Sequence, residues 1–99
     1  MAFVSNDAME FLWQQEMQYL ADYRKLYERR RDLRRQWSKL WFEYEDLMKA
    51  SGLQIGRDPR HMAPPAAQKA WKTMRANKAQ QRLIAQKFHA LKEAHSDGF

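Results

Sequence analysis

The sequence predicts an all-α protein in which a long first helix is followed by a shorter second helix that returns antiparallel to it, as a helical hairpin or a small bundle. Three observations predict this fold. Residues 5–50 contain neither Gly nor Pro, apolar residues recur there at heptad spacing, and all three prolines of the chain fall within residues 53–65. Two long segments therefore favour helix, and helix breakers separate them.

The first helix is expected at about residues 5–51. Ser5 suits the N-cap position, and Val4 and Met9 are spaced for a hydrophobic staple around it. At the other end Gly52 is able to take the left-handed conformation that terminates helices, with Leu53 folding back onto the last turn.

A heptad pattern runs through this first helix and predicts the face that it buries. The d positions are Leu12, Tyr19, Leu26, Leu33, Leu40 and Leu47. The a positions are Met9, Glu16, Tyr23, Arg30, Trp37 and Tyr44. The e positions add Trp13, Leu20, Tyr27, Arg34, Trp41 and Met48. The stripe is wider than a two-stranded seam, which favours contact with two neighbouring helices.

Residues 52–64 are expected to form a loop, and Pro65 suits the first position of the second helix. That helix is expected at about residues 65–95, before a short tail at 96–99, and the whole chain is expected to form a single helical domain. Its apolar face comprises Ala67, Ala70, Met74, Ile84, Phe88 and Leu91.

The two helices are expected to differ in length, roughly 69 Å against roughly 45 Å at 1.5 Å per residue. The second helix then ends near residue 20 of the first and leaves apolar residues uncovered: Phe3, Val4, Met9, Phe11, Leu12, Trp13 and Met17. An apolar patch of this kind predicts self-association or a protein partner. The alternative is a break of the first helix between residues 22 and 30, which makes a third helix and places Leu12 and Trp13 in the core.

Basic residues form two blocks that are candidates for binding nucleic acid or an acidic protein surface. The first block is Arg24, Lys25, Arg29, Arg30, Arg31, Arg34, Arg35 and Lys39. The second comprises Arg57, Arg60, Lys69, Lys72, Arg75, Lys78 and Arg82, and the five on the second helix are expected opposite its apolar face. Contact with backbone phosphate, independent of base sequence, is the expected mode. The alternatives are a solvated face or, for Arg30 and Arg34, a seam position paired with an acid such as Glu16.

Aromatic residues lie among these cations, and their heptad spacing predicts that most of them pack in the core. Phe42 and Trp71 fall off the main stripe or at its edge. These two are the candidates for stacking on a base or anchoring a protein partner.

Several classes of function find no support in the sequence. There is no cysteine, so disulfides and thiol chemistry are excluded, and no Ser or Thr adjoins a His in a catalytic motif. His89, Glu93 and His95 are expected to be solvated residues at a helix end rather than metal ligands. We therefore expect no enzymatic activity, no cofactor, no small-molecule substrate and no membrane insertion, and a cytoplasmic protein.

Three hypotheses for function remain. The first is an assembly subunit or accessory of a nucleoprotein complex that binds RNA or DNA backbone. The second is an adaptor or inhibitor, encoded by a phage or mobile element, that binds a host protein through the apolar N-terminal patch and the basic face. The third is a structural coiled-coil spacer.

Overall fold

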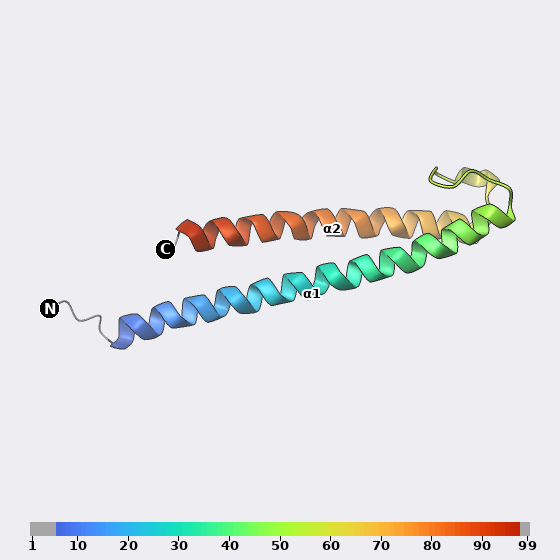
Figure 1. Ribbon diagram of the computed structural model, residues 1–99. Helices are drawn as coiled ribbons and strands as arrows, with labels where there is room; N and C mark the ends of the chain where they lie inside the picture. The colour runs from blue at the N-terminus through green and yellow to red at the C-terminus, as the bar shows by residue number, and fades with distance from the viewer. Residues whose placement is uncertain (1–5, 98–99) are drawn as a thin grey trace.

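The computed structural model describes residues 6–97 and shows a hairpin of two long helices (Figure 1). Helix α1 spans Asn6–Ala50 and helix α2 spans Pro65–Asp97, with one short 3-10 helix, η1, at Arg60–Met62 between them. Residues 6–97 contain no β-strand. The molecule is a rod of 77 × 18 × 15 Å.

The predicted all-α hairpin is therefore confirmed, and α1 continues through residues 22–30 without the break that would have produced a third helix. The described part of α1 has no Gly or Pro to interrupt its hydrogen bonds. The expected N-cap at Ser5, and the apolar residues Phe3 and Val4, lie outside the described residues.

Helix α1 ends at the predicted glycine. Gly52 has φ +67°, and its N–H donates to the carbonyl of Lys49 at 3.1 Å. The N–H of Leu53 donates to the carbonyl of Met48 at 2.9 Å. This pair of bonds is the Schellman motif, which satisfies carbonyls that the last helical turn leaves free.

Helix α2 begins at a pair of prolines. The carbonyl of Pro64 accepts hydrogen bonds from the N–H groups of Ala67 and Gln68 at 2.9 and 3.2 Å. Pro65 stands at the first helical position, where its missing N–H costs nothing. Gln68 also donates through Nε2 to the carbonyl of Ala63 at 2.8 Å, which ties the loop to the first turn of α2.

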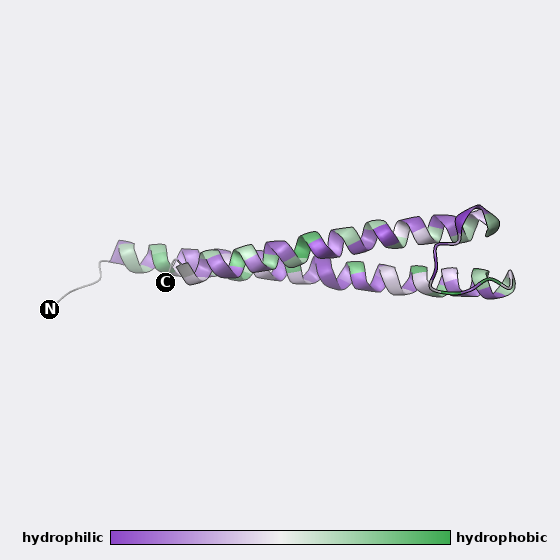
Figure 2. Cartoon of the chain, turned by 90° about the horizontal axis from the view of Figure 1, so that it is seen from above, coloured by the Kyte–Doolittle hydropathy of each residue, from purple (hydrophilic) through white to green (hydrophobic). Residues whose placement is uncertain are grey.

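The two helices pack as an antiparallel coiled coil. The positions of α2 that face α1 alternate in steps of three and four residues and are all buried or half-buried: Ala67, Ala70, Met74, Asn77, Gln81, Ile84, Phe88, Leu91 and His95. Alternating steps of three and four residues keep one stripe against a neighbouring helix. In Figure 1 the two ribbons lie close together at the turn and apart at the free end, whereas in Figure 2, seen from above, they overlap at the free end and lie apart at the turn. Helix α2 therefore winds partly around α1 along the rod.

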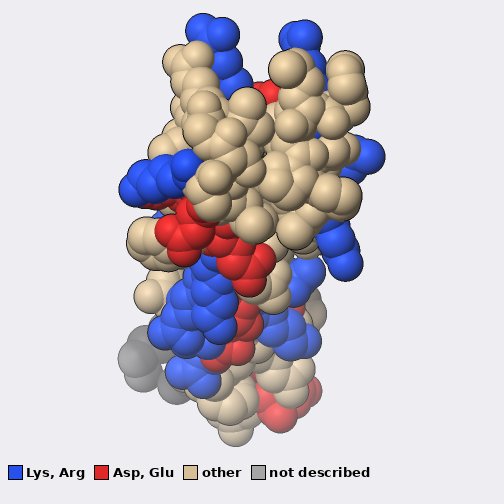
Figure 3. Space-filling model, turned by 90° about the vertical axis from the view of Figure 1, so that its right-hand side faces the viewer, with Lys and Arg blue, Asp and Glu red and all other residues tan. Residues whose placement is uncertain are grey.

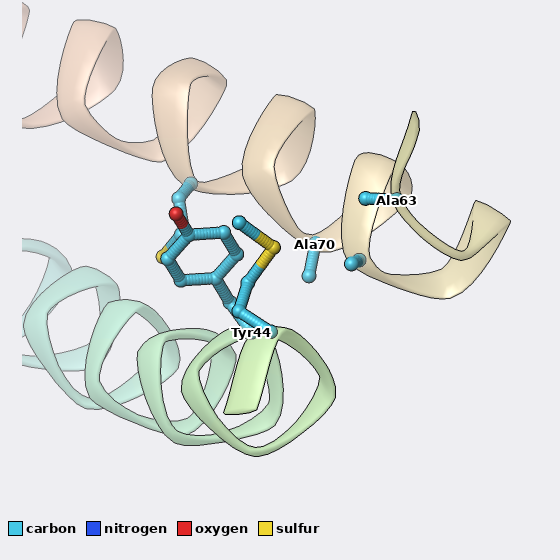
Figure 4. Packing of buried hydrophobic residues seen from close by; sticks show 6 residues of the cluster. Tyr44, Ala63 and Ala70 are labelled. Carbon is cyan, nitrogen blue, oxygen red and sulfur yellow. The ribbon is translucent and has the colours of Figure 1, made fainter. Parts of the chain in front are cut away.

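The larger part of the core lies at the turn end (Figure 4). Its buried members are Tyr44, Met48, Ala63, Ala67, Ala70 and Met74. Tyr44 is completely buried, and its hydroxyl donates to the carbonyl of Arg57 at 2.5 Å and accepts from the N–H of Gly56 at 3.0 Å. The alanines leave room for this large ring between the helices, and the ring in turn holds the loop in place.

A second, smaller core cluster comprises Leu33, Ile84 and Phe88, with Leu26 packed against it. A polar contact separates the two clusters, where the buried Asn77 donates through Nδ2 to the carbonyl of Leu33 at 2.8 Å. Gln81 donates to Asn77 Oδ1 at 2.6 Å, so the amide oxygen is also satisfied.

The free end of the hairpin differs from the expectation. Helix α2 reaches Glu16 rather than ending near residue 20: His95 Nε2 lies 2.8 Å from Glu16 Oε2, and the His95 ring stacks on Tyr19 at 3.8 Å. The difference arises from the register of the two helices: Asn77 lies at Leu33 and His95 at Glu16, so α2 is shifted several residues toward the N-terminus of α1 relative to a pairing of residue 65 with residue 50. Residues 6–15 of α1 still project past the end of α2 and carry apolar side chains into solvent (Figure 2).

Candidate functional site

The hairpin has one side on which cations from both helices gather without acids. A groove of about 390 Å³ runs between α1 and α2 on this side. Its lining residues are Trp37, Trp41, Trp71, Met74, Arg75, Lys78, Ala79 and Arg82. The walls are thus tryptophan from both helices, and the rim on α2 is cationic.

Helix α1 extends this cationic surface toward the free end. Arg34 stands seven residues before Trp41, two helical turns away on the same face. Arg31 is three residues before Arg34 and is therefore its neighbour on the helix surface. Both line a second hollow, of about 450 Å³, beside Tyr27. We call Arg31, Arg34, Arg75, Lys78 and Arg82 the basic face.

No acid interrupts this side of the hairpin over its middle length. The positions at heptad spacing along it are 17, 20, 24, 27, 31, 34, 38 and 41 on α1 and 68, 71, 75, 78, 82 and 85 on α2, and none is Asp or Glu. Arg24, seven residues before Arg31, continues the cationic character.

The other side of α1 is electrostatically mixed. Four residues spaced by seven share one line along the helix surface, and their charges alternate in the order Lys25, Asp32, Lys39, Asp46. Such a face neutralises itself, whereas the basic face is left with an unbalanced positive potential. At the turn end, Lys and Arg lie around an uncharged surface, and a group of Asp and Glu lies beside it (Figure 3).

Within residues 6–97, Arg31 and Lys49 are the Lys and Arg residues that form ion pairs. Arg31 lies 3.4 Å from its chain neighbour Asp32, and both side chains are about half exposed. A contact of this length and exposure contributes little. Arg34, Arg75 and Arg82 have no carboxylate partner in the described part of the chain.

Aromatic rings fix one member of the basic face. Lys78 Nζ lies 4.7 Å from the centroid of Trp37, over its ring. Trp37 in turn stacks on Trp41, with 5.5 Å between centroids and 14° between planes. The ammonium group is therefore held in place at the groove by a cation–π contact while remaining on the surface.

The basic residues expected from the sequence do not all meet on this face. Arg75, Lys78 and Arg82 line the groove, whereas Lys69 and Lys72 are exposed on α2 and do not line it. The groove therefore gathers three of the five α2 cations that the sequence groups on one face. On α1, Lys25 lines neither hollow of this side, whereas Arg35 and Lys39 line the second hollow together with Arg31 and Arg34.

The remaining predicted cations have individual structural contacts. Arg29 donates to Gln80 Oε1 at 3.0 Å on the opposite side of the hairpin. Arg57 and Arg60 are exposed residues of the loop, and Arg60 takes φ +50°, with its N–H donating to Asp58 Oδ1 at 3.0 Å.

The two arginines expected in the seam behave differently. Arg30 is half-buried there, with its guanidinium carbon 5.2 Å from the centroid of Phe88. Arg34 is exposed, because the e positions in the middle of α1 face outward. The acid Glu16 is engaged with His95 rather than with either arginine.

The candidate anchors also separate. Phe42 is 64% exposed and free to contact a partner. Trp71 is half-buried against Tyr44, with ring centroids 5.2 Å apart, so most of its ring belongs to the core. Its Nε1 is buried without a hydrogen-bond partner in the described structure.

The uncovered N-terminal residues are exposed, as far as they are described. Met9, Phe11, Leu12, Trp13 and Met17 all lie in solvent, and Trp13 is 63% exposed. Leu20 and Tyr27 are also exposed although α2 runs beside them, and the helix lengths alone do not predict this exposure. Their spacing from Trp13 by seven and fourteen residues was the available signal.

The polar residues in the contact between the two helices are not among the residues predicted from the sequence. Asn77, Gln81 and His95 face α1, and continuing the three-and-four spacing from Ala67 finds all three. His95 is thus not the solvated residue that was expected, whereas His89 is exposed and lies 2.9 Å from Glu93.

Residues 6–97 hold no group of three or more metal-ligating side chains. Neither helix has a stretch long and apolar enough to cross a bilayer in the described part of the chain.

One exposed ion pair shifts two pKa values. The Lys49 ammonium, 2.7 Å from Glu45, lowers the pKa of the Glu45 carboxyl through a hydrogen bond and through its charge. The same contact raises the pKa of Lys49. Lys49 lies in the last turn of α1, where its positive charge also interacts favourably with the negative end of the helix dipole.

The chain matches no protein-family model, no curated protein and no solved structure.

Proposed function

We propose that the protein binds the phosphate backbone of nucleic acid through the basic face, as a small subunit or accessory of a cytoplasmic nucleoprotein complex. The observation that supports this is the one-sided surface itself: Arg31 and Arg34 of α1 and Arg75, Lys78 and Arg82 of α2 share one side with no acid among them. One-sided positive charge is typical of polyanion binding. No element of the hairpin is arranged to read base edges, so binding is independent of sequence.

The length of the surface suits a short stretch of nucleic acid. From Arg31 to the level of Arg75 the basic face extends along roughly 14 Å of helix at 1.5 Å per residue. This corresponds to about four phosphates of one strand of duplex DNA, which are spaced by roughly 3.4 Å. The five cations of the basic face predict a logarithmic salt slope of roughly −4.5 on duplex DNA and a shallower slope on single strands.

The test compares variants of equal charge. Arg75→Gln with Arg82→Gln removes two cations from the basic face, whereas Lys69→Gln with Lys72→Gln removes two exposed cations of the same helix that lie outside that face. Fluorescence anisotropy with labelled duplex DNA, single-stranded DNA and RNA of mixed sequence measures affinity at several salt concentrations. We expect the first variant to bind at least tenfold more weakly with a salt slope smaller by about two, and the second to bind like the parent.

Equal losses in both variants would mean that net charge alone attracts the ligand, and they would overturn the proposal. Absence of binding by the parent protein at low salt would overturn it too.

A second candidate function is that of an adaptor or inhibitor of a host protein, and the exposed apolar residues of the projecting segment favour it. Here purified nucleic acid does not bind. Affinity purification from the native host recovers a protein in the presence of nuclease, and Trp13→Ala or Phe11→Ala abolishes the recovery. Loss of the co-purified material on nuclease treatment argues for the first function.

A further inference from the structure

A second apolar stripe runs along α1, separate from the stripe that faces α2. Trp13, Met17, Leu20 and Tyr27 occupy it, and they are 63, 46, 50 and 50% exposed. Their steps of four, three and seven residues place them on one face. Leu20 and Tyr27 lie beside α2 yet remain exposed, so the stripe is not merely an effect of the shorter second helix. We call these four residues, with Glu10 and Arg24 at the same spacing, the outer stripe.

The outer stripe changes charge along its length. Glu10 precedes its apolar centre, and Arg24 interrupts its far half, seven residues before Arg31. The surrounding chain has the same polarity, because residues 6–23 contain four acids and no Lys or Arg. Two such stripes complement each other only when they run antiparallel, since a parallel arrangement aligns acid with acid and cation with cation.

We infer that a second copy of this chain covers the outer stripe, antiparallel to the first, with a two-fold axis between Met17 and Leu20. Each Met17 then packs on Leu20 of the other copy at the centre. In the next layer Trp13 meets Arg24 of the other copy, which suits a cation–π contact. In the outermost layer Glu10 meets Tyr27, whose hydroxyl is a donor for the carboxylate.

A second copy suits this stripe because an isologous interface requires a self-complementary surface, and the outer stripe is acidic on one side of its apolar centre and basic on the other. The proposed interface also ends where the stripe changes from apolar to cationic side chains. Beyond Tyr27 the stripe continues as Arg31 and Arg34, so the basic face stays outside the contact. The four-helix arrangement that results gives the wide apolar stripe of α1 its two neighbours, one of them α2.

The mass in solution tests the inference without reference to nucleic acid. Sedimentation equilibrium of nuclease-treated protein should give twice the 12.0 kDa of one chain at micromolar concentration. Met17→Glu with Leu20→Glu should weaken the dimer at least a hundredfold. Phe11→Glu is the matched control, because Phe11 is 59% exposed on the same segment but points away from the outer stripe. A monomeric parent protein at 100 µM, or equal dissociation by Phe11→Glu, overturns the inference.

Two further variants test the antiparallel arrangement and do not depend on the fold of the double glutamate variant. Trp13→Ala and Arg24→Ala should each weaken the dimer about tenfold, and the double variant should lose little more than either single variant, because the two residues contact each other only in the antiparallel arrangement. Because the chain has no cysteine, copies carrying Met17→Cys can be mixed with copies carrying Leu20→Cys. The mixed disulfide should dominate on oxidation, whereas predominance of the two symmetric disulfides shows a parallel dimer and overturns the inference.

Discussion

His95 Nε2 lies 2.8 Å from Glu16 Oε2, and this contact marks the place where α2 ends beside α1. The His95 ring also stacks on Tyr19. The last contact between α1 and α2 is therefore made by polar and aromatic side chains from both helices. The contact closes the hairpin. On the N-terminal side of Glu16, α1 continues alone, and its apolar side chains meet solvent.

Replacing His95 by Ala should loosen the last turns of α2 without unfolding the hairpin. The change removes the contact with Glu16 and the stack on Tyr19, which together are worth about 1–2 kcal/mol. Amide hydrogen exchange should speed up over residues 88–97 and stay unchanged at Tyr44. His89→Ala is the control, because His89 is exposed, and equal effects of the two changes contradict the role assigned to His95.

Two replacements of Asn77 should distinguish its effect on unfolding free energy from its effect on the register of α1 against α2. Asn77→Ala loses the hydrogen bond to the Leu33 carbonyl and leaves a small cavity, so it should cost about 1–3 kcal/mol of unfolding free energy. Asn77→Leu removes the polar group but fills the space, and it should be near neutral in thermal unfolding while allowing other registers of the two helices. The nuclear Overhauser contact between Tyr19 and His95 reports the native register. Full retention of that contact in Asn77→Leu would falsify the role in register.

Tyr44→Phe should lower stability through the loop. The hydroxyl satisfies the Gly56 N–H and the Arg57 carbonyl, and its removal leaves both without that partner. The expected cost is about 1–3 kcal/mol, or roughly 4–8 °C in Tm per kcal/mol for a chain of this size. Tyr23→Phe, at an exposed position of α1 outside the outer stripe, should stay within about 0.5 kcal/mol of the parent. Similar melting curves for the two variants argue against an anchoring role for Tyr44.

Lys49→Ala should raise the pKa of Glu45 toward its ordinary value, because the hydrogen bond and the charge of Lys49 lower it. A carboxyl whose pKa is lower in the folded state contributes stability above its unfolded pKa and loses it as pH falls through the folded value. The small contribution of this pair should therefore vanish under acidic conditions. Titration of the Glu45 side chain by NMR measures the shift, and an unchanged titration in Lys49→Ala excludes Lys49 as the cause.

Trp71→Phe should leave stability unchanged or raise it slightly. The ring still packs on Tyr44, and the buried Nε1–H without a partner disappears, which removes a cost of about 1–3 kcal/mol against some lost contact area. Thermal unfolding tests this expectation. If nucleic-acid affinity falls while Tm holds, Trp71 contributes to binding at the groove in addition to packing.

Much of the fold follows from local sequence signals. The absence of Gly and Pro before residue 51, the glycine after it and the proline pair at 64–65 act on the backbone of their own segments, so the ends of the helices at the turn could be read directly. The candidate site could be predicted only in part. The basic blocks are visible in the sequence, but which cations line the groove is not, and Arg75 lines it whereas Lys69 and Lys72 do not.

By itself the sequence determined two helices, an antiparallel return, and an amphipathic first helix with more apolar surface than the second can cover. Only the tertiary structure decided which apolar positions of α1 face α2. The a, d and e positions are all rich in apolar residues, so the rotation of one helix about the other cannot be obtained from hydrophobicity alone. Packing resolves it: Tyr44 needs the small alanines of α2, and Asn77 needs the Leu33 carbonyl. That rotation leaves Trp13, Met17, Leu20 and Tyr27 outside the seam and brings Arg34 to the same side as Lys78.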